Sequence, residues 1–333
     1  MVKTSAKPRI LRWNCDTIFI FLRTLKINSH NPIFKPYQAK NHNMNTTPFS
    51  KIIAGTMTWG LWGKNLNKNE MIDLMYTCLD SNISTFDHAD IYGGYTTEAA
   101  FGTAYAASKI DRKKIQLISK CGIQYTSENR NNLIKHYDYS KSYIIWSVEQ
   151  SLKNLQTDYL DLLLLHRPSP LMHADDIAEA ITQLKSEGKI LDFGVSNFTP
   201  MQTDLIQTKT KVNYNQIQFS ATHLQAMLDG SLDYMQINSI RPMAWNPLGS
   251  VFKGSDDVSK RVKAIATDLA VKYEVEIDVL LLAWILKHPS GVLPVCGTTD
   301  SMRVGQLMRA TTLELDLQDW FSVWVESVGT KVP

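Results

Sequence analysis

From residue 51 onward, short apolar runs alternate eight times with amphipathic stretches of helical period. The apolar runs lie at residues 51–56, 84–86, 115–119, 159–165, 192–195, 215–219, 241–244 and 291–295. Segments between them, such as 69–79, 143–155, 176–186 and 258–273, repeat apolar residues at spacings of three and four, as in helices buried on one face. Strands that alternate with helices indicate a parallel sheet. Eight such units predict an α/β fold, a closed (β/α)8 TIM barrel formed as one domain.

An open, doubly wound sheet is the alternative for the same pattern. A dinucleotide site of that fold needs a Gly-x-Gly-x-x-Gly motif after the first strand, and none follows residues 51–56. Two further segments stand out. Residues 122–141 form a long connection expected to overhang a functional site. Residues 317–327, with three large aromatic side chains, predict an extra C-terminal helix packed against the barrel or its mouth.

The first 45 residues differ in charge from the rest of the chain. Residues 1–43 hold eight Lys and Arg residues against Asp16 alone, which leaves 27 basic and 31 acidic residues in the remainder. A basic appendage on a mildly acidic body does not indicate a nucleic-acid partner. We expect residues 1–45 to be a basic extension that is either disordered or the result of a mis-assigned start, with translation beginning at Met44; a transit peptide is the alternative. Residues 46–333 are expected to form the barrel.

Composition narrows the class of protein further. Hydrophobic residues make up 44% and charged residues 20% of the chain, as in ordinary globular proteins. No segment approaches the roughly 20 apolar residues that span a bilayer. Four widely spaced cysteines form no Cys-x-x-Cys pair, and no zinc-ligand spacing occurs. We therefore expect a cytoplasmic protein without a membrane span or a metal site.

Polar side chains follow three neighbouring strands of the expected barrel. Asp87 and Tyr92 follow the second strand, Lys120 the third and His166 the fourth. Catalytic groups of such barrels sit at the C-terminal ends of the strands, so these four can meet. A phenol, whose pKa is about 10, is a weak acid unless a cation stabilises its phenolate. Lys120 would supply that cation.

In this arrangement Asp87 would keep Lys120 charged, and His166 would hydrogen-bond the substrate oxygen. Such a set suits proton delivery to a carbonyl oxygen, although none of these residues supplies electrons, so a cofactor is required. A different reading remains open, in which Lys120 forms a Schiff base in a barrel isomerase or lyase.

These residues lie in segments that together resemble the aldo-keto reductase superfamily, from about residue 50 to the C-terminus. The matching segments are 86–93 (FDHADIYG), 118–122 (ISKCG), 164–168 (LLHRP), 194–198 (GVSNF) and 214–216 (YNQ). The resemblance implies reduction of an aldehyde or ketone, with NADPH as the coenzyme and NADH as an alternative. It also implies that Asp87, Tyr92, Lys120 and His166 act as a catalytic tetrad.

The resemblance further implies a set of cofactor contacts. Side chains that bind the nicotinamide carboxamide, stack on its ring or bind the adenosine 2′-phosphate would be Ser196, Asn197, Gln216, Trp245, Asn246, Leu248, Thr298, Thr299 and Arg303. A lysine common in the phosphate loop is missing, and Asp300 adds a negative charge there. The preference for NADPH over NADH is therefore expected to be weak.

Two tryptophans after the first strand would lie at the same mouth. We expect Trp59 to contact the substrate and Trp62 to serve in packing. Residues 251–255 resemble a loop that folds over the dinucleotide. The alternative from another class is an NADP-binding regulatory subunit with vestigial activity. The particular carbonyl substrate and the oligomeric state do not follow from the sequence.

Overall fold

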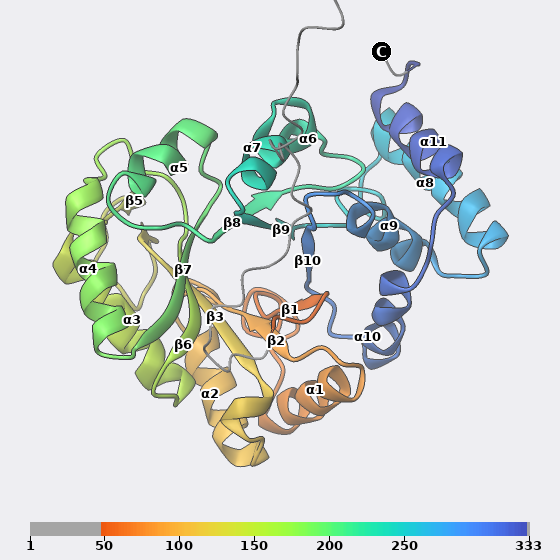
Figure 1. The fold of residues 1–333 in the computed structure, drawn as a ribbon. Coiled ribbons are helices and arrows are strands. Elements are labelled where there is room, and N and C mark those ends of the chain that lie inside the picture. The colour runs from red at the N-terminus through yellow and green to blue at the C-terminus, as the bar shows by residue number, and fades with distance from the viewer. Residues whose placement is uncertain (1–47, 332–333) are drawn as a thin grey trace, which may run out of the picture. The chain divides into compact units, whose positions relative to one another are not determined.

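The computed structural model describes residues 48–331, and the predictions for residues 1–45 lie outside them. Eight parallel strands of this region close into a barrel, and the helices surround it (Figure 1). The (β/α)8 prediction is confirmed, because every strand overlaps one of the eight expected runs. In order round the barrel the strands are β1 (Ile53–Gly55), β10 (Leu293–Cys296), β9 (Arg241–Trp245), β8 (Tyr214–Gln218), β7 (Ile190–Ser196), β6 (Leu160–Leu165), β3 (Gln116–Cys121) and β2 (Thr85–Asp87).

The helices begin and end near the predicted positions, and several carry side-chain caps. Asn67 and Glu70 form a capping box at the start of α1, which satisfies backbone N–H groups that have no partner within the helix. The α-helices are α1 (Lys68–Asp80), α2 (Thr97–Ser108), α3 (Lys141–Leu155), α4 (Ala174–Ser186), α5 (Pro200–Gln207), α6 (Gln225–Leu228), α7 (Ser231–Ile237), α8 (Asp257–Lys272), α9 (Ile277–Leu286), α10 (Ser301–Leu307) and α11 (Leu317–Val328), and the 3-10 helices are η2 (Arg112–Lys114) and η3 (Met308–Thr311).

The extra C-terminal helix packs on the outside of the barrel. Trp320 of α11 stacks on Trp284 of α9 with ring centroids 5.0 Å apart. Each indole N–H donates to the other residue's carbonyl, at 3.0 and 2.9 Å. These bonds satisfy the N–H groups of both indoles, so the Trp pair joins α11 to α9, while α11 also packs on α8.

Alternate residues of each strand face the barrel interior or the surrounding helices. Ile118, Leu162 and Leu164 belong to the interior cluster, whereas Leu117 and Leu163 belong to the layer between strands and helices. Because successive side chains of a strand point to opposite faces, Lys120 shares the interior face with Ile118. The strand period thus places a lysine inside the barrel at the C-terminal end of β3.

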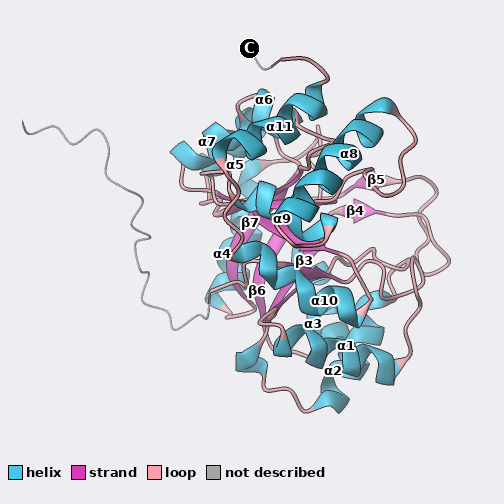
Figure 2. Cartoon of the chain, turned by 90° about the vertical axis from the view of Figure 1, so that its right-hand side faces the viewer, coloured by secondary structure: helices cyan, strands magenta, loops and turns pink. Residues whose placement is uncertain are grey.

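The connection of residues 122–141 contains a short hairpin that the sequence did not predict. Its strands, β4 (Ile123–Gln124) and β5 (His136–Tyr137), pair with each other and not with the barrel (Figure 2). Two residues per strand are too few for an alternating pattern to be recognised. Ile123 packs in a cluster with Ala89, Ile91 and Tyr92, so the connection does lie against the expected site. Among residues 48–331 no helix is long and apolar enough to cross a membrane.

Candidate active site

The four expected catalytic residues come together at the C-terminal ends of β2, β3 and β6. The Lys120 ammonium donates to Asp87 Oδ2 at 2.6 Å and to the Tyr92 hydroxyl at 3.1 Å. Its third bond, at 2.8 Å, goes to the His88 carbonyl, so all three of its protons are used. The imidazole of His166 meets the Tyr92 ring edge to face, with centroids 6.1 Å apart. The side chains of Asp87 and Lys120 are both almost fully buried.

Burial and charge oppose each other at these residues. Burial disfavours the charge on Lys120, but Asp87 and Tyr92 outweigh burial and raise the pKa of the ammonium above its usual value. Burial also raises the pKa of the Tyr92 phenol, while the Lys120 cation acts in the opposite direction. At neutral pH Tyr92 is therefore a neutral phenol. Its hydroxyl oxygen accepts the hydrogen bond from Lys120, so the hydroxyl proton can be donated to another group.

His166 is neutral at the same pH. Burial, and then the Lys120 cation, lower the pKa of its imidazole well below the usual value. Its Nδ1 is buried and has no hydrogen-bond partner among the described residues. A buried ring nitrogen without a partner is uncommon in folded proteins, although Trp59 Nε1, His88 Nε2 and Trp324 Nε1 share this property here.

The residues expected to bind the nicotinamide form one hydrogen-bonded chain next to this group. Trp245 Nε1 donates to Asn197 Oδ1, Asn197 Nδ2 donates to Ser196 Oγ, and each distance is 2.8 Å. Ser196 Oγ donates to the Gln216 carbonyl, and the Gln216 amide donates to Asp87 Oδ1, again at 2.8 Å. Hydroxyl and amide groups at adjacent strand ends provide the donors and acceptors that a carboxamide requires, so these residues fit a nicotinamide.

Asn246 and Leu248 lie in the turn that follows β9. Asn246 has a φ of 52°, and its carbonyl accepts from the Gly249 N–H at 2.9 Å. Leu248 is partly buried against the main core. The turn brings both residues beyond Trp245, on the path to residues 251–255.

Of the expected phosphate-binding residues, Arg303 is bound to a carboxylate. Arg303 donates through Nε and Nη2 to Asp278 Oδ2, at 3.0 and 2.8 Å. Asp300 caps α10 by accepting from the N–H groups of Met302 and Arg303, and Thr298 Oγ1 accepts from the Asp300 N–H. The Arg303 guanidinium is therefore already paired with a carboxylate, and Asp300 adds a second negative charge at the start of α10, so no fit to a phosphate dianion follows from this arrangement. Thr299 is half-buried beside them.

The prediction for the two tryptophans needs a correction. Trp59 is only 1% exposed and packs against Phe86 and Phe101, with ring centroids 6.0 and 5.9 Å away. It is a core residue and is not placed to contact a substrate. Trp62 instead is 38% exposed and lies beside Tyr92 and Tyr125, at 6.2 and 5.3 Å. The three-residue spacing of the pair gave no means of deciding which ring faces the mouth.

Sequence reasoning missed two further residues near the tetrad. The fully buried His88 contacts Thr56 Oγ1 through Nδ1 at 2.8 Å and supplies a carbonyl to Lys120. Burial lowers the pKa of its imidazole to about 3, so it is a neutral part of the scaffold. Arg167 follows His166 and lies over the Trp245 ring. Its position two residues after the end of β6, next to His166, is the signal that could have identified it.

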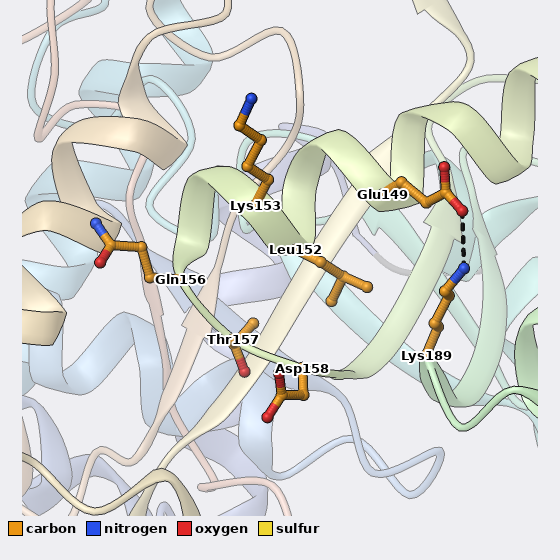
Figure 3. A pocket seen from close by; sticks show the side chains of 7 residues that line it. All are labelled: Glu149, Leu152, Lys153, Gln156, Thr157, Asp158 and Lys189. Atoms are coloured by element: carbon orange, nitrogen blue, oxygen red, sulfur yellow. Dashed lines mark hydrogen bonds and ion pairs between the residues drawn. The ribbon is translucent and has the colours of Figure 1, made fainter.

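A hollow on the outer surface lies at the opposite ends of the strands. It is formed by the end of α3, the turn before β6 and the residue before β7 (Figure 3). One of its lysines is already in an ion pair, because Lys189 binds Glu149 at 2.7 Å. The hollow is far along the strands from His166, so it is not part of this site. Its lining residues are Glu149, Leu152, Lys153, Gln156, Thr157, Asp158 and Lys189.

The fold and this site define a barrel enzyme whose ionisable groups lie at the C-terminal ends of its strands. A model of the aldo/keto reductase family matches residues 51–323. The chain is 42% identical over 293 residues to the uncharacterized oxidoreductase YcsN of Bacillus subtilis, an alignment that covers 86% of this chain and 96% of that one. It is 36% identical over 260 residues to a 6-dehydroglucose reductase of Agrobacterium fabrum, covering 77% and 86%.

Solved structures have the same fold. An aldo/keto reductase of Klebsiella pneumoniae, solved with NADP and acetate, superposes with a TM-score of 0.70 at 24% identity and covers 83% of this chain and 90% of its own. The chain belongs to the aldo/keto reductase family. It is thus an NAD(P)H-dependent oxidoreductase.

Proposed function

We propose that the protein reduces the carbonyl group of an aldehyde or ketone and that Tyr92 is the proton donor. The observation that carries this proposal is the Lys120 ammonium, which binds the Asp87 carboxylate at 2.6 Å and the Tyr92 hydroxyl at 3.1 Å. A phenol in contact with a fixed, charged ammonium can lose its proton to a substrate because the cation stabilises the phenolate that remains.

Each residue of the tetrad has a separate task. When bound, NADPH would supply the hydride for the carbonyl carbon. Tyr92 gives its hydroxyl proton to the carbonyl oxygen, which completes the alcohol, and Lys120 stabilises the resulting phenolate. Asp87 keeps Lys120 charged and in place. His166, neutral and next to Tyr92, orients the substrate oxygen by a hydrogen bond.

The charge state of Lys120 disfavours the Schiff-base alternative. An amine must be unprotonated to attack a carbonyl, whereas the surroundings of Lys120 raise its pKa and occupy all three of its protons. The same contacts support a purely electrostatic role for this lysine.

The cofactor would be held by the residues that form the hydrogen-bonded chain. Ser196, Asn197 and Gln216 would bind the carboxamide, and Trp245 would stack on the ring. NADPH is supported by the NADP-bound Klebsiella structure. The pairing of Arg303 with Asp278 supports the use of NADH as well, because a nucleotide without the 2′-phosphate needs no free arginine.

We test the proposal with Tyr92→Phe, which removes only the hydroxyl. Turnover should fall by about 10²–10⁴-fold, the usual contribution of a positioned proton donor, while the Kd for NADPH, measured by protein fluorescence, stays unchanged. Tyr76→Phe, at an exposed tyrosine of α1, is the matched control. NADPH oxidation is followed by absorbance with a panel of aldehydes and ketones that includes 6-dehydroglucose, after the name of the Agrobacterium relative. Normal activity of Tyr92→Phe would show that another group is the acid.

A further inference from the structure

Arg167 is fixed at the mouth of the barrel by bonds to its backbone. It directly follows His166 at the C-terminal end of β6. The Arg167 N–H donates to the Tyr139 hydroxyl oxygen at 3.1 Å, and that hydroxyl donates in turn to the Arg167 carbonyl. Tyr139 is itself buried just before α3. The start of the Arg167 side chain is therefore held in one place relative to His166.

The guanidinium of Arg167 has no anionic partner in the part of the chain that the structure describes. Within residues 48–331 it has no ion pair and its five N–H donors make no hydrogen bond; its contact is with the Trp245 ring, 5.4 Å from the centroid. Two other arginines of the described residues are paired with carboxylates. Arg112 binds Asp161 at 2.6 Å, and Arg303 binds Asp278 at 2.8 Å. A half-buried arginine with free donors is suited to a planar oxyanion, which it can bind through two parallel hydrogen bonds.

The charges around Tyr92 and His166 leave the site positive. Lys120 is matched by Asp87. After burial and Lys120, the Arg167 cation and then that of Lys135 lower the pKa of His166, and no carboxylate acts on it. The Arg167 charge also acts on Tyr92. A binding site with an unmatched cation favours anionic ligands over neutral ones of the same size.

We propose that Arg167 binds an anionic oxygen group of the substrate, so that the enzyme prefers small aldehydes or ketones that carry a carboxylate or a phosphate. This inference rests on the proposed reductase function and adds the class of its substrate. The anion would lie against the guanidinium of Arg167, on the side not covered by the Trp245 ring, while the carbonyl oxygen lies at Tyr92 and His166.

The experiment compares substrates that differ in charge but little in size. Succinic semialdehyde is paired with butanal, glyoxylate with methyl glyoxylate, and glyceraldehyde 3-phosphate with glyceraldehyde. For the wild type, kcat/KM should be higher for the anionic member of at least one pair, and that advantage should shrink as NaCl is raised. The pair in which the anionic substrate has the higher kcat/KM identifies the preferred anion and its distance from the carbonyl group.

Arg167→Met should raise the ratio of the anionic to the neutral KM by about 10- to 100-fold, the usual loss for a charge-assisted hydrogen bond. Arg167→Lys keeps the charge but loses the two parallel N–H donors, so its KM ratio should lie between those of the wild type and Arg167→Met. Arg309→Met, at an exposed arginine of η3, is the matched control and should leave the ratio unchanged. Folding of each variant is checked by thermal melting.

A binding measurement separates this inference from the proposed function. Succinate, which has no carbonyl to reduce, should bind the wild type in calorimetry and bind Arg167→Met at least 10-fold more weakly. If no carbonyl is reduced but succinate binds in this way, the reductase proposal fails and the anion site stands. Equal KM changes for charged and neutral substrates, or a loss of NADPH binding in Arg167→Met without loss of succinate binding, would overturn the anion site.

Discussion

The side-chain amide of Gln216 donates a hydrogen bond to Asp87 across the barrel interior, at 2.8 Å. The two residues lie on β8 and β2, which are four strands apart in either direction round the barrel (Figure 1). Asp87 thus joins Lys120 on one side to the proposed carboxamide-binding residues on the other. A substitution at Lys120 or at the proposed carboxamide-binding residues should therefore affect the other group as well.

This link predicts a double effect for Gln216→Met. The substitution keeps the size of the side chain and leaves Asp87 Oδ1 buried without its donor, which costs about 1–3 kcal/mol. We expect a lower unfolding midpoint in urea, a weaker Kd for NADPH and a reduced kcat together. Gln218→Met, at the partly buried glutamine on the same strand, is the control. A kcat that is unchanged while NADPH binding weakens would show that the bond to Asp87 has no part in the reaction.

The fold was predictable because its strands and helices differ in period. Runs such as residues 159–165 are apolar on both faces and short, and the helices between them repeat at three and four residues. The grouping of Asp87, Lys120 and His166 followed from the rule that strand ends converge at one mouth. Local pattern and chain order were enough for both.

Other features depended on side-chain direction in loops, where neither the strand period nor the helix period applies, or on long-range pairing. Trp59 and Trp62 are three residues apart in one loop, and only the packing of Phe86 and Phe101 decides that Trp59 is the buried ring. The ion pair of Arg303 could not be predicted for a related reason, because its partner Asp278 lies 25 residues away on another helix. Long-range pairs of this kind arise from tertiary packing alone.

Asp90 should make stability depend on pH. It is buried, accepts from Ser147 at 3.1 Å, and its Oδ1 has no partner among the described residues. Burial, and then the nearby Glu98 carboxyl, raise the pKa of Asp90 from 3.8 to about 8. The folded protein therefore keeps a proton that the unfolded chain releases above pH 3.8. The contribution of this proton to the free energy of unfolding is fully present below pH 3.8 and is lost as the pH rises toward about 8.

Asp90→Asn removes this ionisation while preserving the shape of the side chain. We expect the variant to match the wild type near pH 4 and to be more stable by a few kcal/mol at pH 8, as measured by urea unfolding across this range. Asp268→Asn, at an exposed position of α8, should show no such trend. A constant difference between Asp90→Asn and the wild type at all pH values would mean that Asp90 is ionised throughout.

Asp278 should set the balance between the two coenzymes. Its carboxylate holds both Nε and Nη2 of Arg303, so a 2′-phosphate must compete with it for the guanidinium. Asp278→Asn removes the charge of the competitor. We expect the Kd for NADPH to fall several-fold and that for NADH to stay the same, since ion pairs at half-exposed sites contribute about 1 kcal/mol or less. Fluorescence titration with both nucleotides measures the two Kd values. Equal changes in Kd for NADPH and NADH would show that Arg303 does not bind the 2′-phosphate.

The two tryptophans should respond in opposite ways to removal of their rings. Trp59→Ala empties a core position beside Phe86 and Phe101 and should cost about 3–5 kcal/mol of stability, with little change in the KM of the folded enzyme. Trp62→Ala removes a ring that lies 6.2 Å from that of Tyr92 and is 38% exposed. We expect it to leave the unfolding midpoint almost unchanged and to raise the KM for aromatic aldehydes more than for small ones, because the apolar surface that would contact an aromatic ring is gone. A larger KM change for Trp59→Ala than for Trp62→Ala would reverse the assignment of the two rings.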